Sequence, residues 1–314
     1  MLARMAKSAA ALLATFTVGQ AKAALAPLDP AAVGDWHYAP RAWPGLPLRA
    51  MDETQRRLLW RLVDLTLSES GAARARAILV LEAILGELEG RPTFRDPENY
   101  HFRCFGRPSA EALWGWRFEG HHLSLTAMLD PERGVLPTPI FMGANRATVP
   151  PPHPRAGLRT LPEEADQGFA LLHGLDDARR ARAILAERSP GDVITGPGRE
   201  LSLRALEGVP LADLLDSSRA AALALVELYV GRLTPALATT EMAAIREAGT
   251  DRIHFAWAGS TTPGRGHYYR LQGPSFVIEY ENSQNDANHC HSVWHNPLSQ
   301  FGRDLLRGHF HHSH

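Results

Sequence analysis

The hydrophobic pattern changes its period along the chain, and this change constrains the fold more than any single motif does. Apolar and polar residues alternate with a period of two between residues 100 and 130 and again between residues 252 and 282, which is typical of strands. Before and between these regions, apolar residues recur every three or four positions, as on the buried face of a helix. We therefore expect an α+β fold, with an antiparallel sheet built from N- and C-terminal hairpins, a helical middle segment and an N-terminal helix pair.

The expected helices carry recognisable end signals. Asp52 can cap a first helix, and Gly71 interrupts the pattern before a second helix from Ala72 to Leu88, which Gly90 closes. Small alanine side chains would let these two helices approach closely as an antiparallel pair. Further helices are expected over residues 163–172, 176–187, 217–233 and 236–248, with a last one from Leu298 to Leu306.

The first 23 residues have the pattern of an export signal. Arg4 and Lys7 precede an apolar run that is too short to span a bilayer, and Ala21-Lys22-Ala23 is a small-x-small cleavage site. We therefore expect an exported protein, periplasmic or secreted, that has no contact with the membrane once this signal peptide, residues 1–23, is cleaved. The alternatives are an N-terminal helix or a membrane tether.

The remaining chain is expected to form a single α+β domain over residues 24–308, because we find no internal repeat and no low-complexity linker. Within it, residues 25–47 look like an irregular arm lying on the domain. Residues 309–314, with the sequence HFHHSH, are expected to be a disordered His-rich tail. The chain has 33 basic and 34 acidic residues and no basic stripe, which excludes nucleic acid as a partner.

Two cysteines, Cys104 and Cys290, lie 290 − 104 = 186 residues apart. An oxidising compartment would allow them to pair, and closing so long a loop could contribute on the order of 5 kcal/mol. The alternative is two buried thiols, and spacing alone does not decide between them.

A histidine-rich segment suggests a metal site. In an extended segment, side chains two residues apart point the same way, so His289 and His291 can bind one ion while Cys290 faces away. Neutral imidazole is a common ligand for zinc, copper and iron, and three protein ligands with an open position are the usual catalytic arrangement. The third ligand would be His121 or His122, at the end of a predicted hairpin, with only one of the two binding. The alternative is a histidine-rich loop that bonds its own backbone.

Carboxylates and arginines near these histidines could take the remaining roles. Glu119 lies just before the hairpin histidines, and Glu279 and Glu281 lie on the strand before His289. Glu279 or Glu119 is a possible further ligand. Glu119 or Glu281 is a possible general base. Arg270 or Arg117 could orient an anionic group.

Aromatic residues support a different class of function. Trp116, Trp257 and Tyr268 could line a ligand groove in a binding protein without catalytic activity, although packing in the core is the simpler explanation. The chain lacks a His-Glu-x-x-His helix, a nucleophile elbow, a phosphate-binding glycine loop and a Cys-x-x-Cys pair, so we expect no nucleotide cofactor.

Several segments together resemble the bacterial and fungal family known as domain of unknown function 3500: WGWRFEGHHLSLT, PIFMGAN, IHFAWAGS, GHYYRLQGPSFVIEYENSQNDANHCHSVWH and FGRDLL. The resemblance covers most of the mature chain and implies no particular reaction. The family pattern includes a Gly-His-His segment and an Asn-His-x-His segment, which match Gly120 to His122 and Asn288 to His291 here. Cys290 is not a hallmark of the family, which weakens the case for a disulfide.

We therefore expect metal-assisted hydrolysis of a small or saccharide-like molecule at one transition metal ion, which would be zinc, or copper or iron. A copper or iron oxidoreductase is the first alternative. A non-catalytic periplasmic ligand-binding protein is the second. The oligomeric state does not follow from the sequence.

Overall fold

The computed structural model describes residues 1–302 of the 314-residue chain. In these residues, thirteen strands form one sheet in the order β1-β3-β4-β5-β7-β13-β12-β11-β10-β8, with β2 beside β3, β6 beside β5 and β9 beside β10. Neighbouring strands run antiparallel apart from β1–β3 and β8–β10, which are parallel. The strands are β1 (Leu25–Ala26), β2 (Leu46–Pro47), β3 (His101–Phe105), β4 (Trp114–Gly120), β5 (Leu123–Asp130), β6 (Gly134–Leu136), β7 (Ile140–Asn145), β8 (Ile184–Ala186), β9 (Val209–Pro210), β10 (His254–Gly259), β11 (His267–Gln272), β12 (Val277–Ser283) and β13 (His289–His295).

The fold confirms the expected α+β class, and the early and late strands do share a sheet, because β7 pairs with β13. Most expected helices are also present, among them one that begins after the Asp52 cap and one that ends at Gly90. The helices are α1 (Leu2–Leu13), α2 (Val18–Ala24), α3 (Pro30–Gly34), α4 (Glu53–Asp64), α5 (Glu69–Glu89), α6 (Pro162–His173), α7 (Asp177–Ala183), α8 (Asp216–Val230), α9 (Pro235–Ala248) and the single turn α10 (Gln284–Ala287), with short 3-10 helices at Leu48–Ala50, Leu211–Asp213, Thr250–Arg252 and Gln300–Gly302.

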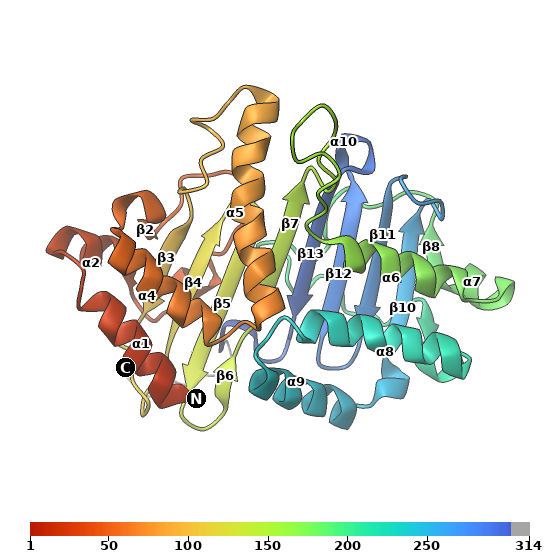
Figure 1. Ribbon diagram of the computed structural model, residues 1–314. Coiled ribbons are helices and arrows are strands. Elements are labelled where there is room, and N and C mark those ends of the chain that lie inside the picture. The colour runs from red at the N-terminus through yellow and green to blue at the C-terminus, as the bar shows by residue number, and fades with distance from the viewer. Residues whose placement is uncertain (303–314) are drawn as a thin grey trace.

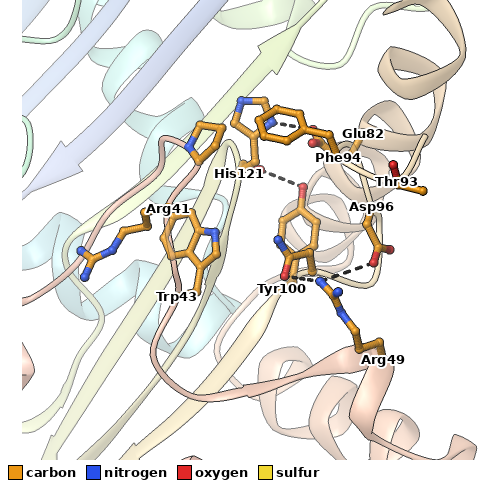
Figure 2. A pocket seen from close by; sticks show the side chains of 11 residues that line it. Arg41, Trp43, Arg49, Glu82, Thr93, Phe94, Asp96, Tyr100 and His121 are labelled. Carbon is orange, nitrogen blue, oxygen red and sulfur yellow. Dashed lines mark hydrogen bonds and ion pairs between the residues drawn. The ribbon is translucent and has the colours of Figure 1, made fainter. Parts of the chain in front are cut away.

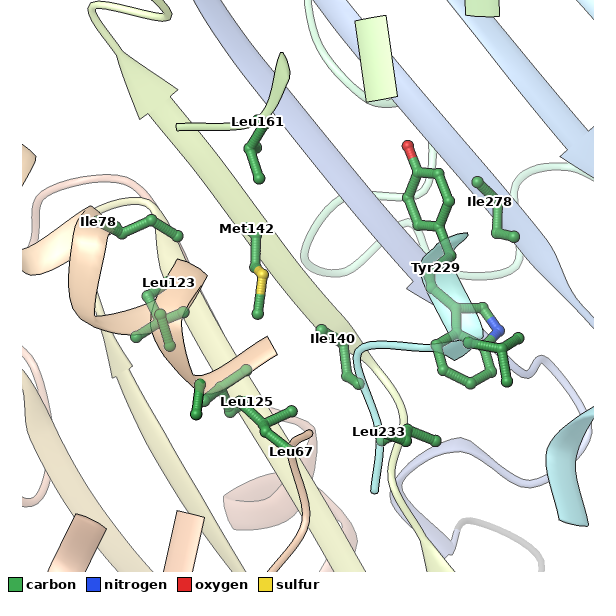
Figure 3. Close-up of a cluster of buried hydrophobic side chains, with 14 of the residues drawn as sticks. Leu67, Ile78, Leu123, Leu125, Ile140, Met142, Leu161, Tyr229, Leu233 and Ile278 are labelled. Atoms are coloured by element: carbon green, nitrogen blue, oxygen red, sulfur yellow. The ribbon is translucent and has the colours of Figure 1, made fainter. Parts of the chain in front are cut away.

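Helices cover one face of the sheet (Figure 1). Their apolar sides and those of the strands bury the main core, and Figure 3 shows Ile78 of α5, Met142 of β7 and Tyr229 of α8 within it. The period-three pattern of the helices and the period-two pattern of the strands place these apolar residues on the facing surfaces.

Irregular segments cover the opposite face. Trp36 and Tyr38 of the N-terminal arm form a second, smaller core with residues that include Phe141 of β7. A later segment is held to the same face through the buried Glu279, which accepts hydrogen bonds from the amide nitrogens of Ile194 (2.7 Å) and Thr195 (2.9 Å). Polar side chains that alternate with the main-core residues along the strands therefore lie beneath loops, where they can form a site.

The element order repeats, which corrects the expectation of a chain without an internal repeat. With α3, β6, α10 and the 3-10 helices left out, the series α1-α2-β1-β2-α4-α5-β3-β4-β5-β7 is followed by α6-α7-β8-β9-α8-α9-β10-β11-β12-β13. The outer pairings match: β2 places Leu46 opposite Phe102, and β9 places Val209 opposite Phe255 in the same register. Sequence likeness survives only in short pieces, such as RFEG at residues 117–120 and RLQG at residues 270–273, which is why the pattern alone did not disclose it.

The two halves meet at matching positions. Besides the β7–β13 pairing, Leu67 and Leu233 form an isolated antiparallel bridge. The amide of Ser68 donates to the carbonyl of Arg232 at 2.8 Å, and the amide of Thr234 donates to the carbonyl of Thr66 at 2.9 Å. These reciprocal bonds indicate an approximate two-fold relation between the halves.

The first 24 residues are packed into this architecture. Helix α1 packs on α4 as α6 packs on α8, and Met5, Ala9 and Leu12 are fully buried. Glutamine side chains add to the attachment: Gln55 donates to the carbonyl of Thr15 at 2.9 Å, and Gln20 donates to Gln55 at 3.0 Å. In the described part of the chain, no helix combines the length and apolar character needed to cross a bilayer.

Three further expectations need correction or fall outside the structure. The expected N-terminal helix pair is present, and α4 and α5 contact each other, but α5 lies mainly along β7 and α4 packs mainly against α1, so the close approach expected from the alanines is not the main packing of either helix. Both cysteines are buried free thiols; β4, β5 and β7 separate the strands of Cys104 and Cys290, a gap of roughly 19 Å at ordinary strand spacing. The last predicted helix begins as the 3-10 turn Gln300–Gly302, and its remainder, like the tail 309–314, lies outside the described residues.

Candidate metal centre

Three histidines from the two halves of the chain converge at the edge of the β7–β13 junction. The Nε2 atom of His289 lies 2.8 Å from Nε2 of His122 and 3.0 Å from Nε2 of His291. These ligand atoms all lie within 4.8 Å of one another. The rings line a cavity of 310 Å³ whose wall also includes Tyr38 and Asp192. Imidazole nitrogens aimed at one point, with free space beside them, form a suitable donor set for a metal ion.

The hairpin between β4 and β5 places His122. The two strands are joined by His121 and His122 alone, and His122 adopts a left-handed φ of 63°. That conformation is unfavourable by roughly 1–2 kcal/mol for a residue with a side chain. The amide of His122 donates to the carbonyl of Tyr38 at 2.9 Å, and its own carbonyl accepts from the amide of Gly143 at 2.8 Å. These two bonds fix the turn against both the arm and β7.

Strand alternation places the other two histidines, as the sequence predicted. His289 and His291 lie on the same face of β13, and Cys290 between them points into the main core. Gly143 of β7 lies directly opposite His291. A Cβ atom at Gly143 would stand 2.9 Å from the His122 ring and 3.1 Å from the His291 ring. A glycine is therefore needed at this position for the two rings to come together.

Burial keeps two of these rings uncharged. Desolvation, followed by the charges of the neighbouring histidines, places the pKa of His122 well below its ordinary value of 6.5. The same two causes lower the pKa of His289 to about 3. Both imidazoles are therefore neutral around pH 7, which is the form that binds metals.

Asp192 orients His291 from outside the centre. The Nδ1 atom of His291 donates to Oδ1 of Asp192 at 2.7 Å, which leaves Nε2 as the free lone pair facing the other two histidines. The Tyr38 hydroxyl donates to the other carboxylate oxygen at 2.9 Å. Burial acts to raise the pKa of Asp192, but its bonds and its charge interaction with His291 outweigh burial, and the pKa lies below its ordinary value.

His121 occupies a separate but adjoining position. Its ring lies against that of His122, with centroids 3.7 Å apart and the ring planes tilted by 35°. Its Nδ1 lies 2.6 Å from Oε2 of Glu82 and 3.2 Å from Nη1 of Arg95. The shorter contact makes Nδ1 the donor to Glu82. The atoms of Glu82, His121 and His122 are also close enough to form a second candidate metal-binding group.

The predicted carboxylates have other partners. Glu279 is fully buried and accepts bonds from Ile194, Thr195 and the Tyr268 hydroxyl, so it holds a covering segment in place. Glu119 accepts from the amide of His37 at 3.1 Å, and Glu281 accepts from the Ser189 hydroxyl at 2.7 Å. Burial raises the pKa of both Glu119 and Glu281. Glu281 lies opposite His291 in the strand register, but neither carboxylate lines the cavity.

The predicted cationic residues and His295 also lie outside the cavity. Arg270 pairs with Glu207 at 2.6 Å. Arg117 donates to the carbonyl of Asp35 at 2.9 Å and to the Thr126 hydroxyl at 2.9 Å. His295 is buried between the side chain of Gln300 and the carbonyl of Thr195. These side chains anchor the covering segments to the sheet.

The predicted aromatic groove is not formed. Trp116 and Trp257 are fully buried in the main core, where Trp257 stacks on His267 with centroids 5.3 Å apart. Tyr268 is 2 % exposed and donates to Glu279. Strand alternation directs the two tryptophans toward the helices, away from the polar face.

Sequence reasoning missed Glu82, Asp192, Tyr38 and Gly143. Glu82 lies within a helix whose pattern suggested only packing, and Asp192 and Tyr38 lie in irregular segments without periodicity. The one available signal was the Asp192 position itself, a carboxylate in a Gly- and Pro-containing segment, and such residues are common in loops.

The comparisons with known proteins identify a family and name no reaction. No curated protein and no solved structure matches the chain. The family model described as "Protein of unknown function (DUF3500)" matches residues 1–303. Because that match covers nearly the whole chain, the protein belongs to the DUF3500 family.

Proposed function

We propose that this protein is a metal-dependent enzyme, with His122, His289 and His291 holding one transition metal ion, and that it catalyses hydrolysis of a small molecule. The observation that carries the proposal is the convergence of three Nε2 atoms, at 2.8 and 3.0 Å, on the wall of a cavity. Ideal tetrahedral zinc would separate two ligand nitrogens by about 3.3 Å. An outward shift of a few tenths of an ångström would admit the ion.

The hydrogen-bond inventory of the three rings supports a cation between them. Each Nε2 carries one proton or one in-plane lone pair, never both. His289 Nε2 is within bonding distance of two other Nε2 atoms, and one proton or one lone pair satisfies only one of those contacts well. A metal ion accepts all three lone pairs at once, which removes this conflict.

The surroundings suit a catalytic rather than a structural ion. Structural zinc sites are usually closed by four protein ligands, whereas catalytic sites keep one position open. Here three imidazoles face a cavity of 310 Å³. The Asp192 carboxylate behind His291 is the usual outer partner of a metal-binding histidine.

The roles follow from position. A bound zinc ion would supply Lewis-acid chemistry to a substrate oxygen or a water. Asp192 holds the tautomer of His291. His121, held by Glu82 and open to the cavity, can hold or pass a proton at Nε2, a role that sequence analysis assigned to Glu119 or Glu281.

Elemental analysis of the purified protein tests the proposal. The protein is prepared without nickel columns and without residues 309–314, so that the terminal histidines do not bind metal. We expect about one equivalent of metal in the parent, and its loss in His122→Ala, His289→Ala and His291→Ala. His173→Ala, which removes an exposed histidine from α6, is the matched control and should keep the metal.

The metal then identifies the chemistry. Zinc, together with hydrolysis of chromogenic esters, phosphates or glycosides that a chelator abolishes, supports the proposal. A coloured protein containing copper or iron, without hydrolysis, would favour the oxidoreductase alternative. A folded parent that takes up none of the three metals after incubation would refute the metal centre.

A further inference from the structure

We infer that the cavity beside the metal centre binds one neutral saccharide unit and is the substrate subsite of the enzyme, an inference that rests on the proposed function. The cavity has a volume of 450 Å³, within the usual range for small-molecule sites. It shares Pro40 and His121 with the metal cavity. A ligand bound in it would therefore lie directly beside the His121 ring, which contacts His122.

Two aromatic side chains at this cavity have no role in the cores. Figure 2 shows Trp43, from the N-terminal arm, and Phe94, from the segment after α5, on its wall. Phe94 is 46 % exposed, and neither residue belongs to the two buried clusters. Trp43 is half-buried and Phe94 is exposed, and partly accessible aromatic rings beside a cavity offer an apolar surface to a ligand.

The charged side chains that line the cavity each have a partner of opposite charge, either in the lining or just outside it. Arg49 lies 3.4 Å from Asp96, and Glu82 lies 3.9 Å from Arg95. Arg41 pairs with Asp35 at 2.9 Å. A ligand therefore has no net charge to neutralise here, and burying a charged one would require desolvation without a new partner.

The same polar groups retain capacity for further bonds. A guanidinium has five N–H donors and a carboxylate about four acceptor positions, and Arg49, Asp96 and Asn99 lie together on one side of the cavity. Hydroxyl groups, which both donate and accept, match such a mixture. A sugar ring combines an apolar face, which can lie on Trp43, with a rim of hydroxyl groups. A purely aromatic ligand would cover these polar groups without bonding them, at a cost in affinity.

Binding of defined probes to the whole protein tests this inference. The probes are methyl glucoside, methyl galactoside and methyl N-acetylglucosaminide, with benzyl alcohol as the aromatic comparison, followed by saturation-transfer NMR and calorimetry. We expect at least one glycoside to bind. Trp43→Ala or Phe94→Ala should each weaken that binding by about tenfold or more, whereas Trp43→Phe should largely restore it. Trp60→Phe is the control, because Trp60 packs on Phe118 on the helix-covered face.

The possible results separate this inference from the metal centre. The subsite is supported if Trp43→Ala keeps its metal but no longer binds the glycoside. It is also supported if His289→Ala still binds the glycoside. If glycosides bind a parent that never holds metal, the ligand class stands and the proposed function fails. The inference is overturned if no glycoside binds, if benzyl alcohol alone binds, or if glycoside binding survives both aromatic truncations.

Discussion

Truncation of one buried side chain in α1 tests whether the first 24 residues belong to the folded protein. Leu12 is fully buried in the main core. Leu12→Ala should therefore lower the free energy of unfolding by about 2–5 kcal/mol, through lost burial and the cavity left behind. For 314 residues, the entropy of unfolding is about 0.66 kcal/mol/K. The melting temperature should then fall by roughly 3–8 °C.

The assay is thermal unfolding followed by circular dichroism, with Val18→Ala as the control. Val18 is 89 % exposed in α2, so its truncation should change the melting temperature little. Removing α1 altogether would also forfeit the burial of Met5, and Met5 with Leu12 accounts for roughly 3–6 kcal/mol. That amount is comparable with the total stability of many proteins, about 5–15 kcal/mol.

The sequence pattern and the packing lead to opposite expectations here. Cleavage after Ala23 would remove α1 and most of α2, and the protein would then be unaffected by the identity of residue 12. The reasoning from packing is refuted, and export is supported, if the protein isolated from its native cells begins at Ala24 and melts at the same temperature whether the gene encodes leucine or alanine at position 12. If its intact mass includes residue 12 and Leu12→Ala is destabilised, α1 is a structural helix.

Three further predictions concern the site and the stability of the fold. Gly143→Ala should push the rings of His122 and His291 apart and lower metal affinity at least about tenfold, measured by competition with a chromogenic chelator; unchanged affinity would contradict the packing argument. Asp192→Asn keeps the shape but removes the charge behind His291, and should lower metal affinity by about 10- to 100-fold, whereas an equal change in Asp177→Asn, at an exposed carboxylate of α7, would show a general charge effect. Burial raises the pKa of Glu241 to about 7 from 4.5, so the free energy of unfolding is highest below about pH 4.5, where this side chain is protonated in both states, and falls as pH rises through 7. Glu241→Gln should therefore stabilise the protein by about 1–3 kcal/mol at pH 8 and not at pH 4 in urea unfolding. Equal gains at both pH values would contradict this explanation.

The local hydrophobic pattern of the sequence predicted much of the fold. The alternation in residues 100–130 and 252–282 predicted the strands, the Asp52 cap predicted the start of α4, and Gly90 predicted the end of α5. The break expected at Gly71 was wrong, because α5 begins at Glu69 and Gly71 lies inside it. The internal repeat was not detected from the sequence. It is seen in the strand register and the element order, and the few residues that the two halves share do not reveal either. Both helices of the expected pair are present, but their main packing partners, α1 for α4 and β7 for α5, were not predicted because they depend on tertiary contacts.

The site was partly predictable as well. Spacing alone placed His289 and His291 on one side of a strand, and the hairpin pattern placed His122 at a turn. The roles assigned to Glu119, Glu279 and Glu281 followed their closeness in sequence, but in the fold these carboxylates bond covering segments. Asp192 and Glu82 reach the histidines from distant parts of the chain, 99 and 39 residues away, and no local pattern indicates such a contact.

The two-fold arrangement gives the histidine cluster a property that neither half has. His122 belongs to the first half and His289 and His291 to the second, and the two halves join along β7 and β13. A chain divided in the connection between β7 and α6 would yield two fragments, each with an incomplete set of ligands. If the cluster binds metal as proposed, metal uptake would then report whether the two fragments have reassembled.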